Sequence, residues 1–166
     1  MEWQDHGQPR AFLVARCGHL KIGVPAPAIR KVVAAPWTQP LPDTPAIVAG
    51  IIDLHGAPLV VLDLARRGAA ARDAIGLDSR IAVLSVPGQV IGLLCDTVEG
   101  VRPLAPAEAH ALAGFLPNAG YPAALPAGDG AMILLCDPAA WLSGSTAAAL
   151  DAALRQLHLP IAEGMP

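Results

Sequence analysis

The stretch GIIDLHGAPLVVLDL, residues 50–64, places an apolar run on each side of a predicted tight turn. Runs rich in Val, Ile and Leu on both sides of a short turn are typical of a β-hairpin. Three ionisable residues, Asp53, His55 and Asp63, lie in the same stretch. They could form a catalytic cluster, a metal site or the polar part of a hairpin that other proteins bind. The rest of the sequence is needed to choose between these.

Short apolar runs recur along the chain and are separated at close intervals by Gly and Pro. This pattern is typical of a barrel or sandwich of many short strands. Gly18 and Gly88 can adopt positive φ in the predicted hairpin turns CGHL and VPGQV, so the strands that flank each turn should be antiparallel. The predicted strands are residues 11–17, 21–24, 29–34, 48–53, 58–62, 80–86, 90–95, 97–102, 121–126 and 131–136.

Helical signals are few. Asp43 and Asp137 are placed as N-caps of two short turns, and the Leu spacing of residues 145–159 predicts one amphipathic C-terminal helix. Residues 66–79 are small and polar and are predicted to connect the two halves of the chain, while residues 103–118 predict a second crossover. Each half contains an apolar run that ends in an acid, VVLDL and MILLCDP, which either two similar barrels or general β patterning would explain.

Composition and charge narrow the class of partner. The chain of 166 residues has 54% hydrophobic residues and a formal net charge of −3, without a run of Lys or Arg. This charge argues against nucleic acid and anionic membrane surfaces as partners. The N-terminus lacks a secretory pattern, and no apolar run approaches the roughly 18–20 residues that span a bilayer, so we expect a cytoplasmic protein without direct membrane insertion. The cysteines, Cys17, Cys95 and Cys136, are expected to be buried reduced thiols.

The sequence contains no recognisable catalytic or cofactor motif. There is no G-x-G-x-x-G, no Walker-type loop, no C-x-x-C and no H-E-x-x-H, and AGDGA at residues 127–131 is interpreted as a hairpin turn. His55 and Asp53 are the only pair placed to contribute to a metal site. Ser143 lies near a helix start, where capping is its expected use. We therefore expect no enzyme activity, no cofactor and no metal.

Five motifs in order resemble the CheW-like family, the adaptors of bacterial chemosensory arrays. In that family a strand with V-x-G, two apolar residues and N-L-R-G is followed by an apolar run that ends in D-L, and here the corresponding residues are VAGIIDLHG and APLVVLDL. The preceding LPDTPAIVAG is similar to the family's loop and helical turn. RIAVLSVPGQVIGLLCDTVEGV is similar to its hairpin, strand and D-x-V-x-x-V step, and GAMILLCDPAAWL to its closing strand and turn.

This resemblance implies an all-β fold of two packed five-stranded SH3-like β-barrels, a hydrophobic groove between them and a C-terminal α-helix. Residues 11–158 would form the domain as two interleaved barrels, with tails at 1–10 and 159–166. It also implies a non-catalytic adaptor that couples methyl-accepting chemoreceptors to a chemotaxis-type histidine kinase, through the CheW-like regulatory domain of that kinase. The alternative function is a small-molecule-binding regulator that uses the cleft between the barrels, with His55 and Asp53 as polar anchors.

Two departures from the family pattern bear on recognition. Asp53 and His55 stand where the family has Asn and Arg in N-L-R-G, so an imidazole replaces a permanently charged, fork-shaped donor. We expect Asp53 and His55 to bind the receptor at the tip of the hairpin, and Asp63 to cap the following turn. Lys31 stands where an acidic residue is common, which reverses a charge near an expected kinase-binding edge.

Trp37 follows Pro36 in the loop AAPWTQPLP, where the backbone cannot continue a strand. Its side chain either packs on its own domain or anchors a partner. We assign Trp37, together with Lys31, to the expected kinase-binding surface.

Overall fold

The hairpin at residues 50–64 forms as the sequence predicts. In a computed structural model that describes residues 8–67, 75–105, 108–112 and 120–156, β4 (Val48–Leu54) pairs antiparallel with β5 (Ala57–Leu62). The two residues between them, His55 and Gly56, have φ values of 54° and 90°. Positive φ at both positions is the geometry of a type I′ turn, which matches the twist of the flanking strands.

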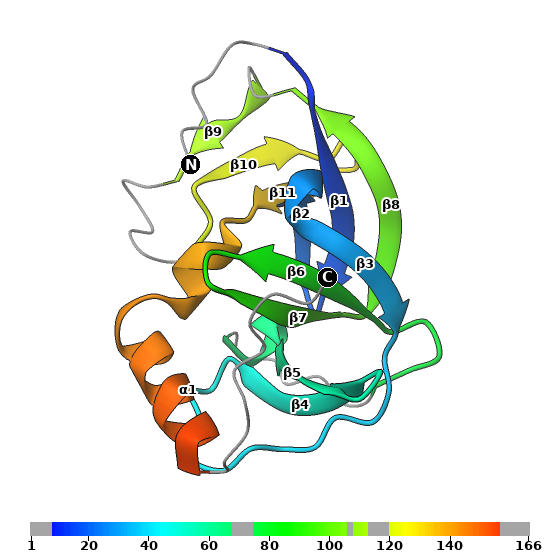
Figure 1. Cartoon of the computed structure of the whole chain (residues 1–166). Coiled ribbons are helices and arrows are strands. Elements are labelled where there is room, and N and C mark those ends of the chain that lie inside the picture. Colours follow the sequence, from blue (N-terminus) through cyan, green and yellow to red (C-terminus); the bar gives the residue numbers. More distant parts are fainter. Residues whose placement is uncertain (1–7, 68–74, 106–107, 113–119, 157–166) are drawn as a thin grey trace.

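Five strands form the lower sheet of Figure 1, in the order β3-β6-β7-β5-β4. It contains β3 (Ile29–Ala34), β6 (Arg80–Val86) and β7 (Gln89–Cys95) beside the hairpin. The chain that follows β3 then pairs with the opposite edge of the sheet, because Gln39 and Ile51 exchange two backbone hydrogen bonds of 2.9 and 2.8 Å. The sheet therefore closes on itself as a small barrel.

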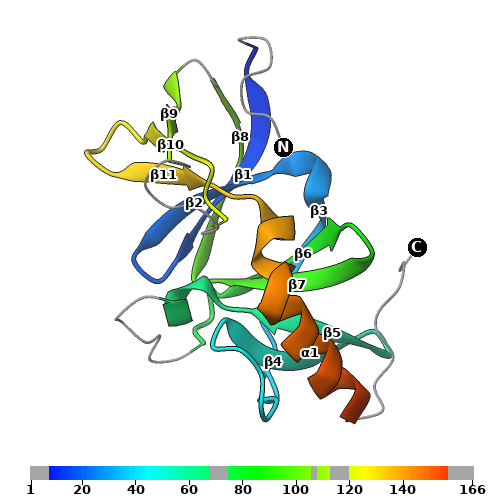
Figure 2. The same ribbon diagram turned by 90° about the vertical axis from the view of Figure 1, so that its left-hand side faces the viewer.

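The other sheet has six strands in the order β8-β1-β2-β11-β10-β9. Its strands come from both ends of the chain: β1 (Arg10–Cys17), β2 (Leu20–Pro25), β8 (Thr97–Leu104), β9 (His110–Ala111), β10 (Ala123–Pro126) and β11 (Met132–Leu135). All neighbours are antiparallel except β2 and β11, which are parallel. The sheet forms the upper part of Figures 1 and 2.

Three apolar clusters hold the sheets together. Within the five-stranded sheet Leu54, Leu59 and Ile81 share one cluster, and within the six-stranded sheet Phe12 and Val14 belong to another. The third and largest cluster contains the alternate residues of the same strands and joins the two sheets. Its members on β1, β6 and β7 are Leu13, Ala15, Cys17, Ala82, Leu84, Val86, Ile91, Leu93 and Cys95. Since β1, β6 and β7 are buried on both faces, they are nearly continuous apolar runs in the sequence.

Short helices complete the fold. The 3₁₀ turns are η1 (Ala26–Ala28), η2 (Leu64–Arg67) and η4 (Pro138–Leu142), and α1 (Gly144–Gln156) follows η4. Helix α1 lies beside β4 and β5 in both views, with Leu150 and Leu154 in the cluster that joins the sheets. Its predicted end at residues 157–159 lies outside the described residues. No helix in the described part of the chain is long and apolar enough to cross a membrane.

The all-β prediction and the C-terminal helix are confirmed, and all ten predicted strands are present with small shifts of their ends. Three details differ. One sheet has six strands because β9 forms inside the predicted crossover at residues 103–118. The segment 66–79, of which residues 68–74 are not described, joins β5 to β6 within one sheet rather than linking two barrels. The helical turn predicted at Asp43 is absent, because that residue lies in a non-helical turn with φ of 56°.

Candidate interaction surfaces

The tip of the β4–β5 hairpin presents Asp53 and His55 to solvent, as expected from the sequence. The Asp53 carboxylate accepts a hydrogen bond of 2.7 Å from the Gly56 amide, so this side chain stabilises the turn. His55 has left-handed backbone geometry and no hydrogen bond to another described residue. The structure therefore places both residues at the hairpin tip but gives them different surroundings, since Asp53 is hydrogen-bonded within the turn and His55 is not.

Asp63, the third ionisable residue of this hairpin region, is buried. Its carboxylate accepts a 3.0 Å hydrogen bond from the Ala65 amide at the start of η2, and it lies 3.8 Å from the Arg66 guanidinium. Asp63 thus caps η2, as the sequence predicts.

Lys31 and Trp37 lie on and just after β3, an edge strand that pairs only with β6 among the described strands. Arg30 is the extra residue of a bulge, and the side chains of Arg30, Lys31 and Val32 are all exposed. Trp37 is 75% exposed, which rules out the alternative in which it packs on its own domain. An exposed Trp beside a charged edge strand is a common anchor in protein interfaces.

The two pairs of predicted site residues occupy separate places. Lys31 belongs to one outer strand of the five-stranded sheet, while Asp53 belongs to the other. Gln39, two residues after Trp37, pairs with Ile51, two residues before Asp53, so both places adjoin the segment that closes the barrel.

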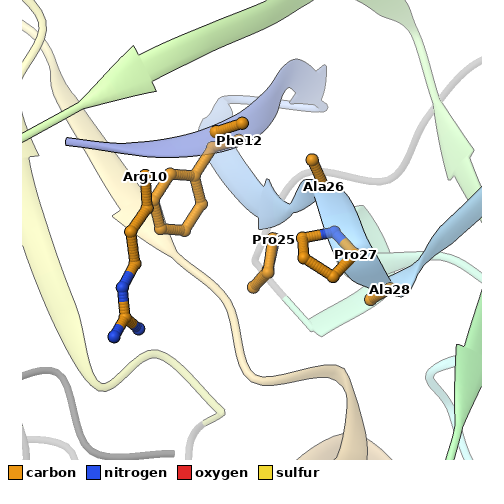
Figure 3. A pocket seen from close by; sticks show the side chains of 7 residues that line it. Arg10, Phe12, Pro25, Ala26, Pro27 and Ala28 are labelled. Carbon is orange, nitrogen blue, oxygen red and sulfur yellow. The ribbon is translucent and has the colours of Figure 1, made fainter.

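An apolar pocket of about 560 Å³ lies where β1 begins and β2 runs into η1. Figure 3 shows Phe12, Pro25 and Pro27 around it, with Arg10 as the one charged residue of its lining. Asp53 and His55, the predicted polar anchors of a cleft in the small-molecule alternative, do not line it. None of the lining residues belongs to a site predicted from the sequence. The sequence signal for them is the pair of prolines in VPAPA, directly after a predicted strand.

The three cysteines are far apart in the sequence, but all of them lie in the core that joins the two sheets. Cys17, Cys95 and Cys136 are free and buried, and the Sγ atoms of Cys17 and Cys95 are 3.8 Å apart. Burial raises the pKa of the Cys136 thiol well above its ordinary value, and the neighbouring Cys95 and Asp137 raise it further. A thiol that stays protonated is a poor nucleophile, so Cys136 behaves as a core residue. No group of three or more His, Cys, Asp or Glu in the described ranges is arranged to hold a metal ion.

Two packed sheets, of which the five-stranded one closes as a barrel, define an all-β domain with an apolar pocket, an exposed edge strand and an exposed Trp. The sequence model of the CheW family, described as the CheW-like domain, matches residues 11–145. The chain therefore belongs to the CheW-like family.

Relatives and a solved structure agree with this assignment. The chain is 36% identical over 91 residues to Protein FrzA of Myxococcus xanthus, which is 55% of this chain and 57% of that protein. It is 33% identical over 93 residues to Chemotaxis protein CheW of Rhizobium meliloti, covering 55% of this chain and 59% of the relative. The matched segment thus spans somewhat more than half of each relative. The crystal structure of the scaffolding protein TtCheW from Thermoanaerobacter tengcongensis superimposes with a TM-score of 0.71 and 24% identity, over 83% of this chain and 95% of that one.

Proposed function

We propose that this protein is a non-catalytic, cytoplasmic adaptor that couples methyl-accepting chemoreceptors to a chemotaxis-type histidine kinase. The observation that carries this proposal is the match of the CheW-like domain to residues 11–145. One relative is named a chemotaxis protein, and a structural neighbour is named a scaffolding protein. An adaptor needs surfaces for two partners, and the exposed hairpin tip and the β3 edge are separate surfaces. The small-molecule alternative is not favoured, because Asp53 and His55, its predicted polar anchors, do not line the apolar pocket.

The proposal is tested by binding to purified partners encoded in the same genome. The receptor partner is the cytoplasmic hairpin of a methyl-accepting receptor, and the kinase partner is the CheW-like regulatory domain of the histidine kinase. An adaptor binds each of them alone and forms a ternary complex with both, which size-exclusion chromatography resolves. Binding to neither partner would contradict the proposal.

On the kinase side, we propose that Lys31 and Trp37 form the contact. Replacing Trp37 with Ala is expected to weaken binding of the kinase regulatory domain by about 1–3 kcal/mol, since an aromatic anchor removed from water contributes this much. Isothermal titration calorimetry measures the change. Leu77→Ala is the matched control, because Leu77 is a fully exposed apolar residue of another loop. Equal affinities of the wild type and both variants for the kinase domain would show that Trp37 is not part of the interface.

On the receptor side, we propose that His55 makes the contact and that Asp53 holds the turn that presents it. His55→Arg is expected to strengthen binding to receptors whose adaptors carry Arg at this position, because it restores a charged bidentate donor. Binding to the native receptor should stay unchanged or weaken. Surface plasmon resonance with both receptor hairpins compares the two affinities.

The control is His55→Asn, since Asn tolerates the left-handed backbone at this position better than Ala does. It removes the imidazole while the turn is kept. His55→Ala should fold but lose some stability, because Ala is found at positive φ less readily than His or Asn. Identical receptor affinities for wild type, Arg and Asn forms would show that recognition lies elsewhere.

A further inference from the structure

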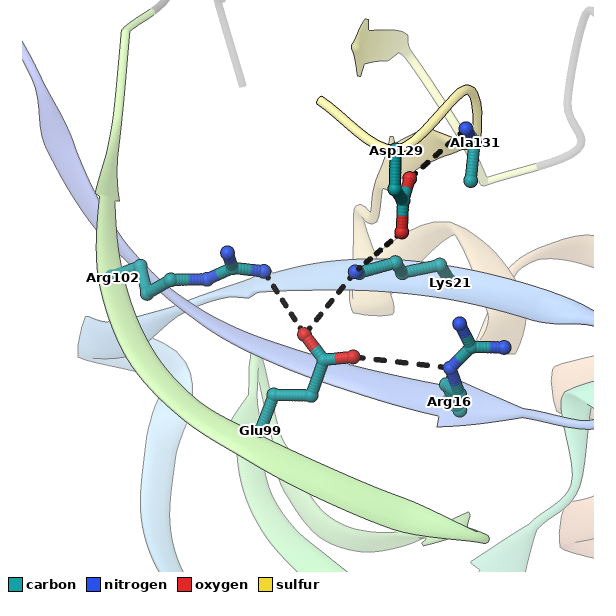
Figure 4. Close-up of polar contacts among 6 residues, drawn as sticks. All are labelled: Arg16, Lys21, Glu99, Arg102, Asp129 and Ala131. Atoms are coloured by element: carbon teal, nitrogen blue, oxygen red, sulfur yellow. Dashed lines mark hydrogen bonds and ion pairs between the residues drawn. The ribbon is translucent and has the colours of Figure 1, made fainter. Parts of the chain in front are cut away.

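Five charged side chains form one cluster on the six-stranded sheet. None of them belongs to the receptor-binding or kinase-binding contacts proposed above. The Glu99 carboxylate is at its centre: Oε2 lies 3.0 Å from the Arg102 guanidinium and 3.3 Å from Lys21 Nζ, and Oε1 lies 3.8 Å from Arg16 Nε. Asp129, in the β10–β11 turn, lies 3.8 Å from Lys21. Figure 4 shows these groups meeting over β8, β1 and β2. We call them the Glu99 cluster.

A β-bulge places Glu99 at the centre. Val14 pairs with Gly100 and Ala15 pairs with Val98, which leaves Glu99 as the extra residue of β8. Bulges of this kind redirect a side chain from the ordinary alternation of a strand. The bulge thus lets Glu99 contact cations that come from β1, β2 and β8 at once.

The two carboxylates neutralise Lys21 and hold the cluster in place. The Lys21 side chain is only 10% exposed and contacts both Glu99 and Asp129. The hydrogen bond from the Ala131 amide holds the pKa of Asp129 below its ordinary value, with further lowering by the charges of Lys21 and Arg16, against an opposing effect of desolvation. Asp129 therefore stays ionised and ties the β10–β11 turn to β2.

Arg16 and Arg102 remain as the outward-facing cations, with side chains 51% and 44% exposed. Each contacts Glu99 through one nitrogen, and their other N–H groups have no partner among the described residues. The cluster has three cations and two carboxylates, so its formal charge is +1 on a chain of −3. Exposed ion pairs contribute only about 0–1 kcal/mol to stability, so the main consequence of the contacts is to orient the two guanidinium groups.

The strand that carries Arg102 is an edge strand, since β8 pairs only with β1 in the described part of the sheet. Consecutive residues of a strand point to opposite faces, so the exposed side chain of Val101 lies on the other face of β8 from Arg102. The surface at Arg16 and Arg102 is therefore recognised by charge.

We propose that Arg16 and Arg102 form a third binding surface, which takes an acidic segment of a partner protein with two carboxylates on the guanidinium groups. The inference rests on the proposed adaptor function, since it places the acidic segment on the receptor hairpin or on the kinase regulatory domain. Charge complementarity selects an acidic protein rather than a polyphosphate or a lipid surface. Glu99 and Asp129, lying among the cations, repel a dense array of phosphates, whereas two spaced carboxylates avoid them.

The test measures the affinity of the receptor hairpin and of the kinase regulatory domain for the wild type and two double variants. Arg16→Gln with Arg102→Gln removes the charges, and Arg16→Glu with Arg102→Glu reverses them. The matched control is Arg155→Glu, an exposed Arg on α1 that also pairs with a carboxylate, Asp151. Thermal unfolding of every variant verifies the fold. Each titration is repeated at low and high salt, and vesicles of phosphatidylglycerol serve as a further probe.

We expect one of the two partners to lose at least tenfold in affinity with the Gln variant and more with the Glu variant. Arg155→Glu should leave both affinities within twofold. The wild-type complex should weaken with salt more than the Gln complex, because screening acts on the pairs that the variant lacks. Exchange of a contacted acid of the partner for Lys should restore binding to the Glu variant.

Two outcomes overturn the inference while leaving the adaptor function in place: unchanged affinity of both partners for the folded double variants, or binding to phosphatidylglycerol vesicles that the same variants abolish. Failure of both partners to bind the wild type would contradict the proposed adaptor function, and the inference that rests on it as well.

Discussion

Replacing Gly50 with Ala is expected to destabilise the protein by about 3–5 kcal/mol, a large part of the roughly 5–15 kcal/mol that holds an ordinary domain folded. Gly50 has φ of 150°, and a β-carbon there would overlap the carbonyl oxygen of Gln39 and meet its carbonyl carbon at 2.7 Å. These are backbone atoms, so the whole segment at Gln39 would have to move. The movement would break the two hydrogen bonds between Gln39 and Ile51 that close the five-stranded barrel.

The matched control for this variant is Gly88→Ala. Gly88 also has positive φ, 81°, but a β-carbon there meets nothing within 4 Å. It should therefore show only the conformational penalty of about 1–2 kcal/mol. Urea denaturation of the wild type and both variants gives the comparison. Equal midpoints for Gly50→Ala and Gly88→Ala would show that the Gln39 segment moves without a loss of stability. Barrel closure would then contribute little to the free energy of unfolding.

Replacing Trp141 with Ala is expected to destabilise the protein by about 3–5 kcal/mol, the range for removal of a buried large aromatic side chain. Trp141 is 1% exposed and belongs to the cluster that joins the two sheets and α1. Its ring packs edge-to-face against Tyr121 with ring centroids 6.4 Å apart. Gly120 lies so close that a β-carbon there would overlap the indole nitrogen, so the surroundings leave little freedom to collapse into the cavity.

Trp37→Ala is the matched control for Trp141→Ala, because the same side chain is removed from an exposed position instead of a buried one. It makes the same substitution at a side chain that is largely exposed, so the free energy of unfolding obtained from urea denaturation should change by less than about 0.5 kcal/mol. The pair separates a stability role from a binding role, because Trp37→Ala is the variant expected to weaken kinase binding. A loss below about 1 kcal/mol for Trp141→Ala would contradict the assignment of Trp141 to the shared core.

The shared core has a consequence for these experiments. Because β1, β6 and β7 each contribute alternate residues to their own sheet and to the cluster between the sheets, the two barrels are expected to unfold together rather than one after the other. Surface variants at Trp37, His55, Arg16 and Arg102 can then be checked by a single transition. An affinity change without a shift of that transition reports on binding.

Local sequence determined much of this protein. Apolar runs, Gly and Pro placed the strands, because strand formation depends on burial of neighbouring side chains and on turn residues a few positions away. The turn residues His55 and Gly56 are next to each other, and Asp63 caps a turn that begins one residue later, so both were accessible from the sequence. The exposure of Asp53, His55 and Lys31 follows from the same local patterns.

Only the tertiary structure decided how distant segments meet. The chain halves do not form the two sheets, because β1 and β2 pair with β8 and β11 from the other end of the chain. Arg16, Glu99 and Asp129 are far apart in the sequence. No local sequence pattern predicts that a bulge at Glu99 will bring them into one cluster. The apolar pocket beside Arg10 depends likewise on where the chain crosses between the sheets after β2, and the exposure of Trp37 depends on the path of the segment that closes the five-stranded barrel. Burial and turn chemistry act over a few residues and are visible in the sequence, whereas strand order and long-range charge contacts depend on packing of the whole chain.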